Sequence, residues 1–331
     1  MIIPHRNFEV ARAQLRRYVS KHRPGRIIVL IGVGGVGKTT MRWNVMRELY
    51  GRPECWGLGC IPTIEVMALL AEKAYFNSKG WAEDSFDQLF TPDISWLIRG
   101  ATPSPETVKV REAIALSSAI WKDVSRNLTE TQCWIKFKNV ARDRALNLYS
   151  LEHASALCIN HKDTSPAHHI INLMSVMESA GSMALLTTIQ TGTALWAGRS
   201  EIRRRMDVVW AAPYNVSDRE EMRCYLSLLR TIGSRYEFRP RDLLGRLAPE
   251  IAAATAAVCG EITNLLDRAE SNALDADRSQ ITAADIETAY YNAKDLGTLW
   301  ADVESFWAAK HADKRDAVAA RADKIWPTEE A

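Results

Sequence analysis

The residues with the clearest chemical potential form a glycine-rich stretch, IGVGGVGKTTM, from Ile31 to Met41. It fits the pattern G-x-x-x-x-G-K-[ST] of phosphate-binding loops and lies between an apolar β-branched run and a segment of helical character. Glycines allow successive backbone N–H groups to face a phosphate, and the following helix adds the positive end of its dipole. The stretch therefore predicts a nucleotide site.

The side chains of this loop have separable expected roles. Lys38 should bridge the β- and γ-phosphates, and the Thr39 hydroxyl should ligate magnesium. A glycine-rich turn that binds nothing is the alternative, and the flanking strand and helix disfavour it. The residues expected to contact the nucleotide are Gly32, Gly34, Gly35, Val36, Gly37, Lys38, Thr39 and Thr40.

The composition is that of an ordinary soluble globular protein. The 331 residues are 47% apolar and 25% charged, and the formal net charge of +2 does not by itself predict nucleic-acid binding. The six cysteines lack CxxC spacing, which favours reduced thiols and a cytoplasmic location. We expect no zinc site among the four clustered histidines, His153, His161, His168 and His169.

No targeting or membrane segment is expected. The first residues lead directly into a helical pattern, unlike a signal peptide, and no apolar run reaches 18 residues.

Strand patterns alternate with helical patterns up to Tyr214. Strands are expected at 26–31, 61–67, 145–151, 183–191 and 208–212, and helices at 38–50, 107–128, 166–179 and 194–206. This alternation predicts an α/β fold with a parallel five-stranded sheet flanked by helices. Later helices are expected at 217–229, 240–258, 261–274 and 283–293. We therefore expect an α/β nucleotide-binding domain (1–214), a small all-helical lid (215–294) and a C-terminal tail (295–331). The tail is expected to pack on its own lid, and docking onto a neighbour or partner is the alternative.

Several short motifs occur in a familiar order. They are IPHRNF (Ile3 to Phe8), the phosphate loop, EHASAL (Glu152 to Leu157), TGT (Thr191 to Thr193), RRRM (Arg203 to Met206) with Pro213-Tyr214, GEITNLL (Gly260 to Leu266) and ITAADI (Ile281 to Ile286). This order resembles the TnsC/TniB-type AAA+ ATPases of DNA transposition, which are related to MuB. Apart from the phosphate loop, each motif is weak alone.

The resemblance implies an AAA+ P-loop NTPase that uses ATP and Mg²⁺. It further implies a homo-oligomer, a ring or a helical filament, on double-stranded DNA, which links a target-selection protein of the TniQ type to the transposase. In such assemblies an arginine finger reaches the neighbour's nucleotide. The candidates are Arg203, Arg204 and Arg205, and the alternative is a solvated helix end.

The sequence departs from the family where hydrolysis is normally promoted. The usual Asp-Glu pair aligns with Glu152-His153, so Glu152 remains as a magnesium ligand while His153 replaces the catalytic glutamate. A neutral imidazole can orient a water in principle, but the loss of a placed general base typically costs a factor of about 100 to 10,000. Weak ATPase activity is therefore expected, and whether the protein is an effective enzyme stays open. A second register would place Leu151 first and Glu152 in the catalytic position.

The sensor positions are less definite. Gln190 or Thr188 could contact the nucleotide from the fourth strand, and Asn264 or Arg268 stands near the expected lid arginine.

The DNA-binding candidates are Lys109, Arg111, Lys136, Lys138 and Arg142. The lysines at 136 and 138 alternate with apolar residues, which predicts an extended segment with both on one face. A solvated strand edge is the alternative reading.

Other classes of phosphate-loop protein fit less well. Partition-type ATPases carry a second lysine where this chain has Val33, and no acceptor site for a metabolic kinase is evident. The main alternative is an NB-ARC-like signalling switch that oligomerises without binding DNA. The sequence leaves open the target DNA, the number of subunits, the identity of the partners and the arginine that serves as finger.

Overall fold

The computed structural model describes residues 3–51, 56–57, 59–68, 75–94, 105, 108–109, 112, 128–159, 165–311 and 321. Its centre is a sheet of β1 (Ile27–Ile31), β2 (Thr63–Met67), β3 (Leu148–Glu152), β4 (Met183–Thr188) and β5 (Met206–Trp210). The strand order is β2-β3-β4-β1-β5, and neighbouring strands are parallel. The predicted parallel five-stranded sheet is confirmed.

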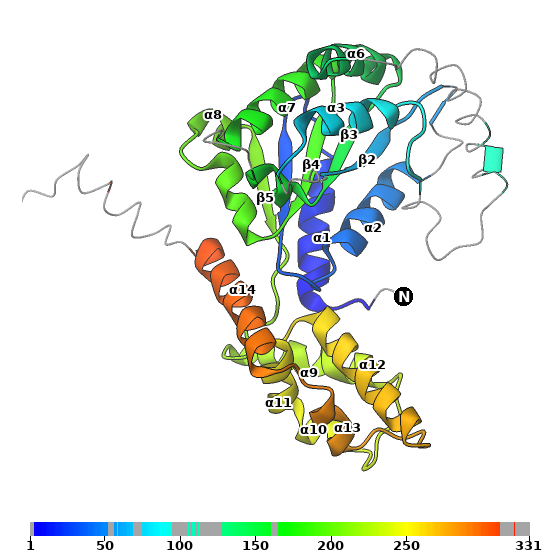
Figure 1. Cartoon of the computed structure of the whole chain (residues 1–331), viewed down its shortest axis with the longest axis vertical. Coiled ribbons are helices and arrows are strands. Elements are labelled where there is room, and N and C mark those ends of the chain that lie inside the picture. The colour runs from blue at the N-terminus through cyan, green and yellow to red at the C-terminus, as the bar shows by residue number, and fades with distance from the viewer. Residues whose placement is uncertain are drawn as a thin grey trace, which may run out of the picture.

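Helices cover both faces of this sheet (Figure 1). They are α1 (Arg6–Val19), α2 (Lys38–Tyr50), α3 (Ser78–Asp87), α6 (Glu130–Asp143) and α7 (Ala167–Ala180), with the shorter η2 (Ala154–Cys158), η3 (Gln190–Trp196) and α8 (Ser200–Arg204). Alternation along β3 separates the faces. Tyr149 points to α3, where it accepts from Trp81 Nε1 at 2.6 Å, whereas Glu152 points to α2.

The second part of the chain is a helical lid below the sheet domain in Figure 1. It contains α9 (Arg219–Gly233), α10 (Leu243–Arg246), α11 (Ala248–Thr255), α12 (Cys259–Asp275) and α13 (Ala283–Thr288). Its buried apolar residues form a core of their own, separate from that of the sheet domain. Two packed cores are consistent with the division into sheet domain and lid.

The last described helix, α14 (Ala293–His311), links the two parts. Phe306 is fully buried and packs edge-on against Trp210 of β5, with the ring centroids 5.5 Å apart. Trp300 Nε1 donates to the carbonyl of Ala253 in α11 at 2.8 Å. The first part of the predicted tail therefore packs on its own chain.

The expected extended segment at 134–138 is wrong, because it lies inside α6. A capping box between Thr129 and Gln132 starts the helix, and its buried residues, Cys133, Trp134, Phe137 and Ala141, recur at helical spacing. Residues 136 and 138 consequently point in different directions, since two residues span roughly 200° of a helix.

The expected helix at 194–206 is also corrected, since 3₁₀ turns and the short α8 replace it. The helix at 240–258 divides into α10 and α11. Most of the expected helix at 107–128, including Arg111, lies outside the described residues.

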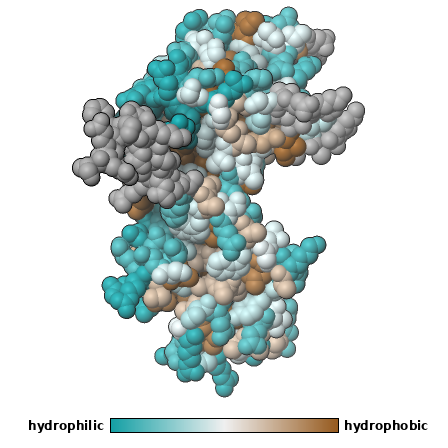
Figure 2. Space-filling model, turned by 90° about the vertical axis from the view of Figure 1, so that its left-hand side faces the viewer, coloured by the Kyte–Doolittle hydropathy of each residue, from teal (hydrophilic) through white to brown (hydrophobic). Residues whose placement is uncertain are grey.

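No helix within the described ranges is long and apolar enough to cross a bilayer. On the face shown in Figure 2, hydrophobic residues form small scattered patches between hydrophilic ones. This face therefore shows no large apolar patch among the described residues.

Candidate nucleotide site

The phosphate loop joins the end of β1 to the start of α2 at the carboxyl edge of the sheet. Gly35 and Gly37 adopt positive φ angles of 76° and 86°, which a residue with a Cβ rarely tolerates. Lys38 is folded back over the loop, and its Nζ donates to the carbonyls of Gly32 and Val33 at 2.8 Å each. Burial lowers the pKa of Lys38 to about 8, and nearby Glu152 partly opposes that shift. The Lys38 ammonium is thus held by two backbone carbonyls, and bound phosphates would compete with these carbonyls for it.

An open cleft of about 520 Å³ lies beside this loop. Its size suits a small-molecule ligand. It is lined by Gly34, Gly35, Gly37, Lys38, Thr39, Thr40, Glu152, His153, Ser155, Thr187, Thr188 and Ile189. The cleft thus brings the loop together with the ends of β3 and β4.

The end of β3 places a carboxylate opposite the Thr39 hydroxyl. The Thr39 Oγ1 atom lies 3.4 and 3.5 Å from the two carboxylate oxygens of Glu152, which is 7% exposed. Leu151 is fully buried in the core, so it offers no ligand to the cleft. The contact with Thr39 supports the register that gives Glu152 the metal-binding position.

This pair fits a magnesium ion bound with nucleotide. One hydroxyl and one carboxylate form a hard oxygen donor set, and Mg²⁺ usually completes its shell with water and substrate phosphates. When bound, the ion would neutralise phosphate charge, with Thr39 and Glu152 as its protein ligands.

His153 follows directly and lines the same cleft. It is exposed and has a left-handed backbone (φ 55°, ψ 37°), a region that His enters more readily than most residues. It ends β3 and caps the 3₁₀ turn η2. The position directly after Glu152 therefore carries an exposed imidazole and no carboxylate.

A buried arginine lies behind Glu152. Arg42, one turn after Lys38 on α2, is completely buried and forms ion pairs with both Glu152 and Glu65 of β2. Its Nη1 also lies 3.3 Å from the Thr187 hydroxyl of β4. The three adjacent strands thus converge on one guanidinium.

Sequence reasoning missed Arg42 and Glu65. The available signals were a charged residue four positions after the loop lysine and a lone carboxylate in the apolar segment IPTIEVM. A buried charge requires a partner, so each of these residues predicts the other only once the fold brings them together.

The lid touches the phosphate loop directly. The backbone N–H of Gly260, at the start of α12, donates to the carbonyl of Gly35 at 2.9 Å. A Cβ at Gly260 would lie 2.6 Å from that carbonyl oxygen, so only glycine permits this approach. Lid position and loop conformation are therefore coupled through backbone atoms.

The N-terminal segment closes another side of the loop. Phe8 lies under Gly37, within 3.5 Å of where a Cβ would stand, and His5 Nδ1 lies 3.1 Å from the Tyr214 hydroxyl. Burial lowers the pKa of His5 to about 4, so this imidazole is neutral at physiological pH. Asn7 donates to the carbonyl of Pro213 at 3.2 Å. These contacts fix the junction between sheet domain and lid.

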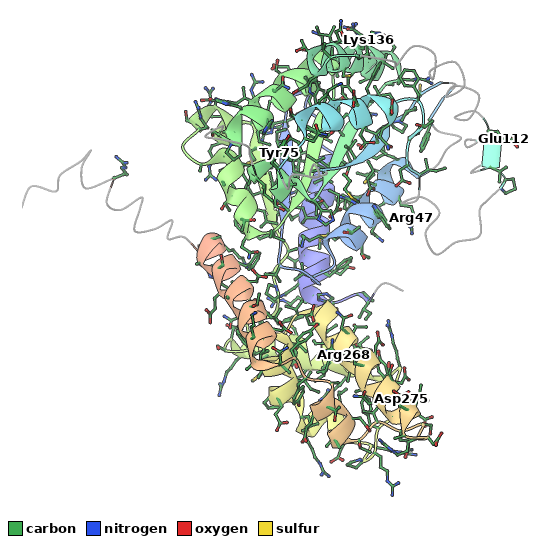
Figure 3. The ribbon with its side chains drawn as sticks, viewed as in Figure 1. Arg47, Tyr75, Glu112, Lys136, Arg268 and Asp275 are labelled. Carbon is green, nitrogen blue, oxygen red and sulfur yellow. The ribbon has the colours of Figure 1, made fainter. Side chains whose placement is uncertain are left out.

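The sensor candidates differ in whether they reach the cleft. Thr188 lines the cleft, whereas Gln190 is buried and donates through Nε2 to Asp302 of α14 at 2.9 Å. In the lid, Asn264 is exposed, and Arg268 lies over the Tyr291 ring at 4.4 Å with its Nε bonded to the Ala289 carbonyl (Figure 3). Arg268 is thus held within the lid.

The three arginine-finger candidates lie at the opposite edge of the sheet from the cleft. They immediately precede β5, and α8 is at the end of the sheet domain remote from the lid (Figure 1). Arg203 and Arg204 are exposed, while Arg205 pairs with Glu178 at 2.5 Å. None of the three therefore faces the cleft of its own chain.

The described DNA-binding candidates do not line the cleft either. Figure 3 shows Lys136 on α6, at the far end of the sheet domain from the lid. Lys138 and Arg142 share one side of that helix at i, i+4 spacing, and Lys109 is exposed. The structure therefore groups Lys138 with Arg142, in place of the expected pairing with Lys136.

Comparison with known proteins identifies the fold. No protein-family model and no curated protein matches the sequence. Among solved structures, Cdc6p from Pyrobaculum aerophilum matches with 16% identity over 87% of this chain and 67% of that chain, with a TM-score of 0.52. The ADP form of the Aeropyrum pernix ORC2 protein matches with 13% identity over 87% of this chain and 70% of that chain, with a TM-score of 0.50.

These similarities establish the fold and nothing finer. The chain spans about two thirds of the length of the proteins it matches. With the strand order and the phosphate loop, they define a P-loop NTPase type of fold, a parallel five-stranded sheet flanked by helices, with a helical lid after the sheet domain.

Proposed function

We propose that this protein is an ATP-dependent AAA+ regulator of DNA transposition that hydrolyses ATP slowly. In this proposal, ATP and Mg²⁺ drive its assembly on double-stranded DNA. The assembly then links a target-selection protein of the TniQ type to the transposase. Such a protein assembles on DNA when it binds ATP, and slow hydrolysis of the ATP then releases the assembly.

One observation carries this proposal. The cleft brings together Lys38, Thr39 and Glu152, which would bind a triphosphate, and the exposed imidazole of His153, which would stand where a catalytic base is expected. Such a site favours a long-lived ATP state. The order of motifs from Ile3 to Ala293 supports the assignment to transposition.

The positions of the arginines support assembly between copies. Arg203 is exposed and lies at the edge of the sheet opposite its own cleft. An arginine there can complete only the site of a neighbouring subunit, as an arginine finger does. Nucleotide binding and oligomerisation are then linked.

The basic residues of α6 support the DNA contact. Lys138 and Arg142 lie on one side of a surface helix, and the repetition of that pair around an assembly would multiply phosphate contacts. This arrangement requires no sequence-specific contact.

The proposal is tested by fluorescence anisotropy of a labelled duplex of random sequence. Binding is measured without nucleotide and with ADP, ATP and a non-hydrolysable ATP analogue, using the wild type and Lys38→Ala. We expect tight binding only with ATP or the analogue and none by the variant. Absence of DNA binding in every nucleotide state would contradict the transposition role and favour an NB-ARC-like switch.

A further inference from the structure

Three neighbouring strands direct polar side chains toward one residue of α2. Glu65 of β2, Glu152 of β3 and Thr187 of β4 alternate onto the same face of the sheet, as the strand registers require. Arg42 meets all three from the helix above. This arrangement lies behind the cleft and is distinct from its lining, except at Glu152 and Thr187.

The geometry divides the two ends of the guanidinium between two carboxylates. Arg42 Nη1 pairs with Glu152 Oε2, and Nη2 pairs with Glu65 Oε1 at 2.5 Å. The other oxygen of Glu65 accepts from Trp43 Nε1 at 2.6 Å. Glu65 is therefore occupied on both oxygens, and it holds the guanidinium in place.

The charge on Arg42 is permanent. A guanidinium does not lose its proton in proteins, and its planar fork suits two carboxylates in a way that the single ammonium of lysine does not. Because the side chain is completely buried, water does not screen its charge from Glu152 as it would at the surface.

A magnesium ion that binds Glu152 must share this carboxylate with the guanidinium of Arg42. Glu152 Oε2 pairs with Arg42, and both carboxylate oxygens also lie near the Thr39 hydroxyl, Oε1 at 3.4 Å and Oε2 at 3.5 Å. The nearby Arg42 charge also reduces the attraction of the carboxylate for a divalent ion.

We propose that Arg42 is a positioning residue that shares Glu152 with the magnesium site, so that ATP binding depends only weakly on magnesium. The inference rests on the proposed ATP site and adds a property that the loop motif does not predict. In functional terms, the ATP-bound state would persist when free magnesium falls, because the buried arginine already neutralises the carboxylate beside the phosphates.

The test is the ratio of ATP dissociation constants in EDTA and in excess magnesium, measured by isothermal titration calorimetry. For wild type we expect a ratio below about 5, the low end of ordinary coupling between two ligands. In the double variant Arg42→Met/Glu65→Gln, which removes the guanidinium and the charge of its second partner, the ratio should rise above about 20.

Two further variants separate charge from folding. Arg42→Lys retains a cation beside Glu152 and should keep the low ratio, whereas Arg12→Met, in α1, breaks a surface ion pair with Glu48 of α2 and should leave the ratio unchanged. A general loss of structure would weaken ATP binding equally in both conditions and would leave the ratio unaltered.

The outcomes distinguish this inference from the proposed function. A wild-type ratio above about 5 would overturn the role of Arg42 alone. So would a double variant that keeps the wild-type ratio while it binds ATP in excess magnesium as tightly as wild type. If the wild type bound no ATP in either condition, the nucleotide site itself would be refuted, and the inference with it.

Discussion

The phosphate loop and the end of β3 face each other across one cleft but are built differently. The loop offers backbone groups and one lysine, and among the described residues Lys38 Nζ donates to the carbonyls of Gly32 and Val33, which phosphates would replace. At the end of β3, Glu152 is paired with a buried arginine, and His153 stands exposed beside it. The loop is prepared for a ligand, whereas the strand end is already engaged with the protein.

Under the proposed function, this difference separates the groups that would bind ATP from those that would promote its hydrolysis. Two of the cations on α2 illustrate it. Lys38 and Arg42 are one helical turn apart, yet the lysine is positioned for phosphate and the arginine for Glu65 and Glu152. Substitution of each should therefore affect a different property.

The largest effect is expected on stability from Arg42→Ala. Removal of one partner from a buried ion pair leaves the other charges uncompensated, which typically costs about 3 to 5 kcal/mol. Thermal and urea unfolding would measure the loss, with Arg12→Ala as the surface control. If Arg42→Ala were as stable as wild type, the buried cluster would not be the structural element described.

Lys38→Ala should instead affect ATP affinity. The loss of charge-assisted hydrogen bonds to two phosphates should weaken binding by at least about 100-fold, since each such bond contributes about 1.5 to 3 kcal/mol. Calorimetric titration measures this, and Lys136→Ala, on the remote helix α6, serves as the matched control. Unchanged affinity in Lys38→Ala would show that the ligand does not use the loop.

A smaller and graded effect is expected from pH. Burial places the pKa of Lys38 at about 8 instead of 10.5, and phosphate binding requires the protonated amine. Below pH 8 the affinity should be constant; above it, ATP binding must take up a proton, and the dissociation constant should rise about tenfold per pH unit. Lys38→Arg, which stays charged, should remove this dependence. A flat wild-type profile through pH 9 would exclude proton-linked binding.

The sequence could predict the parts of the molecule that rest on local pattern. The apolar runs gave the strands, and the loop residues follow from a motif whose spacing is dictated by phosphate geometry. The prediction of an extended segment at 134–138 was wrong because apolar and basic residues alternate there as in a strand. The helix becomes evident only from the packing of Trp134 against Trp81 and of Phe137 against Tyr149.

The contacts that tune the site could not be predicted in this way. Arg42 and Glu65 are 23 residues apart in sequence, and Gly35 and Gly260 belong to different domains. Gln190 likewise meets Asp302 of α14 across 112 residues. Such pairs depend on how whole elements pack, which one sequence without its fold does not show.

The most direct test of the central claim measures hydrolysis of bound ATP in a single turnover, by quenched-flow, for wild type, His153→Glu and His153→Ala. The account predicts slow turnover in wild type and in His153→Ala. It predicts an increase of about 100-fold or more in His153→Glu, because a carboxylate base is restored beside Glu152. Rapid hydrolysis by wild type that is lost in His153→Ala would contradict it, because the imidazole would then be an effective base.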